Sequence, residues 1–102
     1  MQVKPGSRWK SAVDSTEVVV VRPPKGDVSL ECGGHPMVAL GEAAPEGLTI
    51  SPDFSGGTSV GKRYVDADSG IELLGSKAGP GSLSVDGRAA TLKDAKPLPA
   101  SD

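Results

Sequence analysis

The chain has one thiol and one imidazole, and they lie three positions apart. Cys32 and His35 flank Gly33 and Gly34, a pair that favours a tight turn. A cysteine beside a histidine is typical of half a metal site, or of a thiolate that a neighbouring base activates for nucleophilic attack. Asp14 is a third candidate if its own turn folds over this one. The alternative is a small buried cysteine and a turn histidine at the rim, because a closed zinc site needs two such pairs.

Carboxylates gather in the second half of the chain. Asp66, Asp68, Glu72 and Asp86 offer oxygen ligands to a hard cation, but their spacing is not that of a calcium-binding loop. We interpret them as residues of a solvated turn. The glycine-rich stretches lack the Lys-Ser/Thr pair of a phosphate-binding loop, so no nucleotide site is expected there.

The elements that would position these residues recur along the chain. Residues 6–45 can be laid over residues 61–97, which indicates two copies of one small unit. The aligned pairs include Trp9 with Tyr64, Glu17 with Glu72, Leu30 with Leu83, Gly34 with Gly87 and Leu40 with Leu92. The expected organisation is a first repeat over residues 1–45, a linker with a possible short strand over 46–60, and a second repeat with a tail over 61–102. Arg8 and Arg63 are equivalent, with Glu17 and Glu72 as their candidate ion-pair partners.

The expected elements are strands. Glycine and proline account for 14 and 9 of the 102 residues, which favours short strands and many turns. Residues 17–22 give the strongest strand signal, because four β-branched residues run together. Strands are expected at residues 9–13, 17–22, 28–32, 36–40, 62–66, 71–74, 82–85 and 88–92, with a possible one at 48–50. The sequence thus predicts an all-β fold of two small knuckle-like repeats, related by approximate twofold symmetry and packed as one compact domain.

The repeat resembles the desulforedoxin-type unit, a rubredoxin-like metal knuckle that also forms the N-terminal domain of desulfoferrodoxins. That family has an aromatic residue before Cys-x-x-Cys-Gly, a strand pair, then Cys-Cys-Gly-x-x-Met. Residues 9–15 and 30–37 stand where the two knuckles would be, as do residues 64–70 and 83–90. The resemblance places the eight ligand positions at Ser11, Asp14, Cys32, Gly33, Asp66, Ser69, Val85 and Asp86.

Only one of these eight positions is a cysteine, whereas a tetrahedral iron or zinc site needs four sulfur or nitrogen donors. The resemblance therefore implies the scaffold without its metal, and we expect neither a metal nor another cofactor. Aspartate and serine side chains are expected to hold by hydrogen bonds the turns that a metal would clamp.

Composition and charge limit the classes of partner that this chain is expected to bind. The formal charge is −2 and the 11 basic residues are scattered along the sequence, so nucleic acid is not an expected partner. No apolar run approaches membrane-spanning length, and the first residues lack the apolar region of a signal peptide. A single cysteine forms no internal disulfide, and a cytoplasmic location fits this usage.

Four consecutive valines interrupt the alternation expected of a strand with one wet face. Val18, Val19, Val20 and Val21 are apolar on both sides of their strand, so each face needs a cover. We expect either a homodimer or higher assembly using these residues, or a strand that lies central in its sheet.

Two classes of function follow. The first is a non-catalytic binding or accessory protein that docks on a partner protein of unknown identity. The alternative is a small enzyme or ligand-binding protein that uses a cleft between the repeats near Cys32, His35 and Asp14. A degenerate metal or redox protein is a further alternative. The sequence leaves open which of these is correct.

Overall fold

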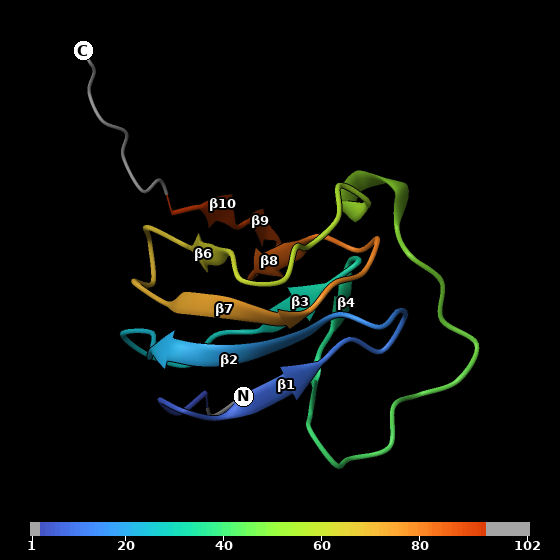
Figure 1. Ribbon diagram of the computed structural model, residues 1–102, viewed down its shortest axis with the longest axis horizontal. Coiled ribbons are helices and arrows are strands. Elements are labelled where there is room, and N and C mark those ends of the chain that lie inside the picture. The colour runs from blue at the N-terminus through green and yellow to red at the C-terminus, as the bar shows by residue number, and fades with distance from the viewer. Residues whose placement is uncertain (1–2, 94–102) are drawn as a thin grey trace.

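The chain folds into two antiparallel sheets, which confirms the all-β class. The computed structural model describes residues 3–93, and Figure 1 shows the two sheets as successive layers. The first sheet has six strands in the order β10-β6-β7-β2-β1-β5, and the second has four in the order β4-β3-β8-β9. Their bounds are β1 Arg8–Lys10, β2 Glu17–Arg22, β3 Leu30–Cys32, β4 His35–Pro36, β5 Val38–Ala39, β6 Arg63–Val65, β7 Glu72–Lys77, β8 Leu83–Val85, β9 Arg88–Ala89 and β10 Thr91–Leu92.

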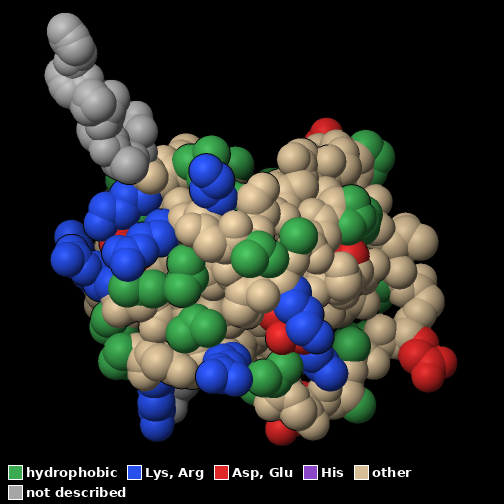
Figure 2. All heavy atoms as spheres, viewed as in Figure 1, with side chains coloured by type: hydrophobic (Ala, Val, Ile, Leu, Met, Phe, Trp, Pro, Cys, Tyr) green, Lys and Arg blue, Asp and Glu red, His purple; other side chains and the backbone are tan. Residues whose placement is uncertain are grey.

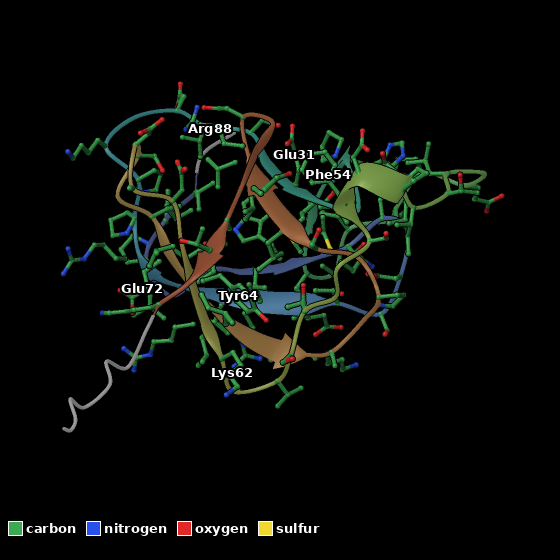
Figure 3. The ribbon with its side chains drawn as sticks, turned by 90° about the horizontal axis from the view of Figure 1, so that it is seen from above. Glu31, Phe54, Lys62, Tyr64, Glu72 and Arg88 are labelled. Carbon is green, nitrogen blue, oxygen red and sulfur yellow. The ribbon has the colours of Figure 1, made fainter. Side chains whose placement is uncertain are left out.

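The core lies between the two sheets. Each sheet contributes its inward-facing apolar side chains, as alternation along a strand requires. Tyr64 points into this space from β6 in Figure 3, and Trp9 packs against the same cluster from β1. The buried apolar residues are Val3, Val18, Val20, Val28, Leu30, Cys32, Met37, Tyr64, Ile71, Leu73, Leu83 and Val85. Among the described residues, no helix is long and apolar enough to cross a membrane.

β2 lies in the middle of the six-stranded sheet. It pairs with β1 on one side and with β7 on the other. Val18 and Val20 are 0% and 1% exposed, so both are buried inside the chain's own core. They are therefore not interface residues, and of the two expected covers for the valine run the central position in the sheet is the one observed. Val19 is only half-buried and Val21 is exposed.

Two expected strands are each split between the sheets. Residues 36–40 contain the end of β4 in the four-stranded sheet and β5 in the six-stranded sheet, and residues 88–92 divide in the same way into β9 and β10. The break falls at Met37 and Ala90, whose amides donate to the carbonyls of Leu30 and Leu83 at 2.8 and 2.9 Å. A local pattern of apolar residues does not reveal such a crossing, because each side of it still looks extended.

The six-stranded sheet is symmetric in its strand order, because each strand of the first half has a counterpart of the second half at the mirrored position. In the six-stranded sheet β5, β1 and β2 of the first half mirror β10, β6 and β7 of the second, and β2 meets β7 at the centre. Ala39 pairs with Trp9, and Leu92 pairs with Tyr64. If Trp9 and Tyr64 are equivalent, as the repeat alignment has them, the equivalent of Leu92 is Ala39 and not Leu40. This is the strand order that a duplication requires, while superposition of the two halves stays a prediction.

Two-residue turns close the β3–β4 and β8–β9 hairpins. Gly33 and Gly34 have φ of 64° and 85°, and Asp86 and Gly87 have φ of 51° and 81°. Both central residues of this turn type need positive φ, which glycine adopts freely and aspartate tolerates. The Gly-Gly and Asp-Gly pairs therefore fix where each hairpin reverses.

The linker contains no strand at residues 48–50. Residues 41–49 are mostly exposed and pair with no strand of the described chain, so Thr49 and Ile50, both of high β propensity, stay irregular. The chain then makes a short 3₁₀ turn, Pro52–Phe54, which was not expected. The tail after residue 93, including the aligned end of the second repeat, lies outside the described residues.

Candidate functional site

Cys32 and Asp14 are brought together. Cys32 ends β3, is fully buried, and has its Sγ 3.9 Å from Asp14 Oδ1. Asp14 lies in the turn between β1 and β2, where its Oδ1 accepts a hydrogen bond from the Thr16 amide at 3.0 Å. Its Oδ2 accepts one from the Gly81 amide at 2.5 Å. The first turn thus folds over the second, and two of the three candidate residues from the sequence share one site.

His35 does not join them. It lies opposite Cys32 in the β3–β4 hairpin, but its Nε2 is 2.9 Å from the carbonyl oxygen of Thr49. A carbonyl only accepts, so this contact requires the proton on Nε2. Within residues 3–93 no side-chain hydrogen bond links His35 to Cys32, so the Cys–His pair is not assembled. His35 instead holds the returning end of the linker.

The thiol is not activated. Burial and the nearby negative charge of Asp14 raise the pKa of Cys32 to about 11, so the protonated form persists at neutral pH. Burial opposes ionisation of Asp14 as well, but hydrogen bonds from the amides of Thr16 and Gly81 outweigh it and lower the pKa of that carboxyl. The pair is therefore a carboxylate beside a neutral thiol, which is the wrong arrangement for a cysteine nucleophile.

Two glycines of the second half make this contact possible. A Cβ at Gly81 would lie 2.8 Å from Asp14 Oδ2 and 3.1 Å from Cys32 Sγ. A Cβ at Gly79 would lie 2.3 Å from Thr16 Oγ1. Only glycine lets the loop between β7 and β8 approach this closely. The loop covers Cys32 and joins the two halves, and beneath it the Thr16 hydroxyl is buried with no partner within hydrogen-bond geometry among residues 3–93.

Serine and aspartate side chains hold the turn that follows the first strand of each half. Ser11 Oγ accepts hydrogen bonds from the amides of Val13 and Asp14 at 3.0 and 3.2 Å. In the second half Asp66 Oδ2 accepts one from the Ser69 amide at 3.2 Å, and Ser69 Oγ accepts one from the Ile71 amide at 3.4 Å. The expectation that serine and aspartate side chains hold these turns by hydrogen bonds is confirmed.

The carboxylates of the second half surround an arginine. Arg88 contacts Asp66 at 2.8 Å, Asp68 at 3.1 Å and, more weakly, Asp86 at 3.9 Å. Hydrogen bonds from Arg88 hold the pKa of Asp66 below its ordinary value, although burial opposes this. Arg88 lies among the three carboxylates and offsets one of their three negative charges, so they form an ion-pair cluster. The expected solvated turn is wrong for Asp66, which is buried.

Glu72 was grouped with these aspartates from the sequence but lies elsewhere. It pairs with Arg63 and with Lys93, each at 3.1 Å. The hydrogen bond from Lys93 is the main reason that the pKa of Glu72 is lowered. Arg63 thus finds its expected partner, whereas Glu17 pairs with Lys77 at 3.3 Å and not with Arg8. Figure 3 shows Glu72 and Arg88 well apart.

The described residues contain no cluster suited to a metal. Among residues 3–93, no group of three or more histidine, cysteine, aspartate or glutamate side chains is placed to hold an ion. Of the eight ligand positions implied by the family resemblance, the structure brings Cys32 and Asp14 into contact, and Ser11 lies near enough to bond the same turn. The absence of bound metal from the purified protein stays a prediction.

A second surface emerges from the strand register. In an antiparallel sheet, directly paired residues project from the same face. Arg8 on β1 pairs with Val19 on β2, Val19 pairs with Leu74 on β7, and Leu74 pairs with Arg63 on β6. These four residues form one row on the side of the six-stranded sheet that faces away from the core. We call this side the outer sheet face.

The outer sheet face is open. Both arginines of the row are exposed, and Val19 and Leu74 between them are half-buried. Figure 2 views this face and shows apolar side chains lying between groups of lysine and arginine. A half-buried apolar centre with a charged border is a common composition of binding surfaces.

Sequence reasoning missed this row. The sequence held two clues. The repeat aligned Arg8 with Arg63, and the four consecutive valines indicated a second apolar face on their strand. What was lacking was the β2–β7 pairing, which places residues 55 positions apart in one line. Long-range strand pairing is not encoded in a local pattern, so the row becomes visible only in the fold.

Comparisons with known proteins assign no family to this chain. Searches against protein-family models, curated proteins and solved structures found no significant match. The resemblance to desulforedoxin-type units accordingly stays a prediction from the sequence, and any function rests on the geometry.

Proposed function

We propose that this protein is a non-catalytic binding module that docks on a partner protein through the outer sheet face. The observation that supports it is the row formed by Arg8, Val19, Leu74 and Arg63, where apolar side chains remain accessible on a face that no described element covers. Partner binding gains most from a few buried anchors, and arginine is among the residues most often found there.

The competing site supports catalysis poorly. Cys32 is 0% exposed and lies beneath Gly81, so a substrate cannot reach its sulfur without opening the junction between the halves. Its thiol is protonated, and His35 is bonded to Thr49. A cytoplasmic location and a partner protein belong to this proposal, as does the absence of a metal centre.

The test compares two sets of variants in the native cell. Tagged protein carrying Val19→Glu or Leu74→Glu is crosslinked and isolated beside Cys32→Ser and His35→Ala, and circular dichroism verifies that each variant is folded. We expect the two face variants to lose a protein that the wild type retains at near one-to-one ratio, while the other two retain it. Loss with Cys32→Ser or His35→Ala, and retention with both face variants, would refute the proposal.

A further inference from the structure

The charge on the outer sheet face indicates what kind of partner it binds. Eight charged residues lie on this face by strand register or form an ion pair with a residue that does. Six of them are basic and two are acidic, although the whole chain has a formal charge of −2. The basic ones are Arg8, Lys10, Arg22, Arg63, Lys77 and Lys93, and the acidic ones are Glu17 and Glu72. The bases are scattered in the sequence and are gathered only by the pairing of the strands.

The two acidic side chains of this face are already engaged. Glu17 pairs with Lys77, and Glu72 pairs with both Arg63 and Lys93. Arg8 has no ion pair within residues 3–93, although its equivalent Arg63 does. Arg22 and Lys10 also have no ion pair within residues 3–93, but of the two arginines in the row only Arg8 has no acidic partner. Its guanidinium is free for an incoming carboxylate, which it can bind through two hydrogen bonds.

The row also sets a spacing. Adjacent strands lie about 4.8 Å apart, so the backbones of Arg8 and Arg63, separated by three strand intervals, lie about 14 Å apart. Val19 and Leu74 occupy the positions between them. The matching surface has carboxylates on either side of an apolar patch that is two strands wide.

We propose that the outer sheet face binds an acidic protein surface whose carboxylates flank an apolar patch. This rests on the proposed docking function and specifies its partner. A second copy of this chain does not fit, because face-to-face pairing would set these basic side chains against one another, and like charges across an interface are strongly unfavourable. Nucleic acid does not fit either, because Trp9 and Tyr64 pack inward and leave no stacking platform on this face.

The experiment uses the full chain and defined probes. Methyl NMR of the protein follows titration with a helical peptide that has a leucine stripe bordered by glutamates, with the same peptide bearing lysines instead, and with single-stranded DNA. The glutamate peptide should shift the methyls of Val19 and Leu74 and bind at least about tenfold more tightly than either other probe at low salt. Raising the salt to about 0.5 M should weaken its binding.

Charge reversal identifies the contact. Arg8→Glu should weaken binding of the glutamate peptide about tenfold or more. Lys25→Glu, an equal reversal of charge in the loop between β2 and β3, should alter it less than about twofold. Equal or tighter binding of the lysine peptide or of DNA would overturn the inference, as would equal effects of the two variants. If that happens while Val19→Glu and Leu74→Glu still lose the native partner, docking stands and only the partner's chemistry is wrong.

Discussion

At the scale of residues, the surroundings of Cys32 show how a candidate nucleophile becomes a structural group. Its sulfur lies against a carboxylate that is itself held ionised by the backbone amides of Thr16 and Gly81. Burial of the sulfur, and after it the negative charge of Asp14, raise the pKa of Cys32 and keep the thiol neutral. The sequence suggested Asp14 as a neighbour of Cys32, but not the loop of residues 79–81 that buries the sulfur.

The first prediction concerns thiol reactivity. With burial and the charge of Asp14 raising the pKa of Cys32 to about 11, the folded protein should react very slowly with a disulfide reagent at neutral pH. In denaturant the thiol is exposed, and it should then react at the rate of a free cysteine. Absorbance of the released thiolate measures both rates. Rapid labelling of the native protein would contradict the buried, neutral thiol described above.

The second prediction concerns Asp14. Asp14→Asn should lower the free energy of unfolding by about 1–3 kcal/mol at pH 7, because two amides lose a charged acceptor. The folded pKa of Asp14 lies below its ordinary value of 3.8, so its contribution is present above that pH and is lost as the pH falls through the folded pKa. The difference between wild type and variant should therefore shrink on acidification.

Urea unfolding at a series of pH values measures that difference. Asp53→Asn is the matched control, since it makes the same change at an exposed position. A loss for Asp14→Asn that is constant down to about pH 2 would show that the charge is not what matters there.

At the scale of elements, β2 organises the fold because both its edges and one face are covered. The run of valines correctly predicted the strand, but only its pairing with β7 decides which side chains are buried. Val18 and Val20 face the core, whereas Val19 faces out toward Leu74.

The third prediction separates the two faces of β2. Val20→Ala removes two buried methyl groups and should cost about 2 kcal/mol of unfolding free energy, including the cavity it leaves. Val19→Ala makes the same chemical change on the outer sheet face and should cost less than about 1 kcal/mol. Chemical denaturation of both variants provides the comparison. A larger loss at Val19 than at Val20 would mean that the register is shifted by one residue.

The sequence predicted most strands and the two tight turns, because β-branched runs and Gly-Gly or Asp-Gly pairs act locally. It failed where the outcome depends on distant parts of the chain. Leu48 belongs to a segment with strand propensity but no neighbouring edge, and Met37 and Ala90 mark crossings between sheets that no local period reports. Asp14 was rightly suspected of joining Cys32, whereas the loop that covers both was not.

At the scale of the whole molecule, the two halves depend on each other. β2 pairs with β7 and β3 pairs with β8, so each sheet is completed across the boundary between the halves. Asp14 and Gly81 add a contact from one half to the other, as do Ser29 and Asp86, with the Ser29 amide 2.7 Å from Asp86 Oδ1.

The fourth prediction follows from this mutual dependence. Residues 1–60 and 61–102, expressed as separate chains, should each be unfolded, because neither buries enough apolar surface alone. Mixing them should restore a β-sheet circular dichroism spectrum and dispersed NMR signals. Folding of either piece by itself would contradict the view that the core is shared.

The most direct test of docking is to map the contact on the native complex. Methyl NMR of the labelled chain, with and without the isolated partner, reports on exposed valines and leucines throughout the fold. The account predicts that the largest changes fall on Val19, Leu74, Val38 and Val65, all on the outer sheet face by register, while Leu48 and Val60 stay unchanged. Changes centred instead on Leu48 and Val60, with Val19 and Leu74 unaffected, would contradict it.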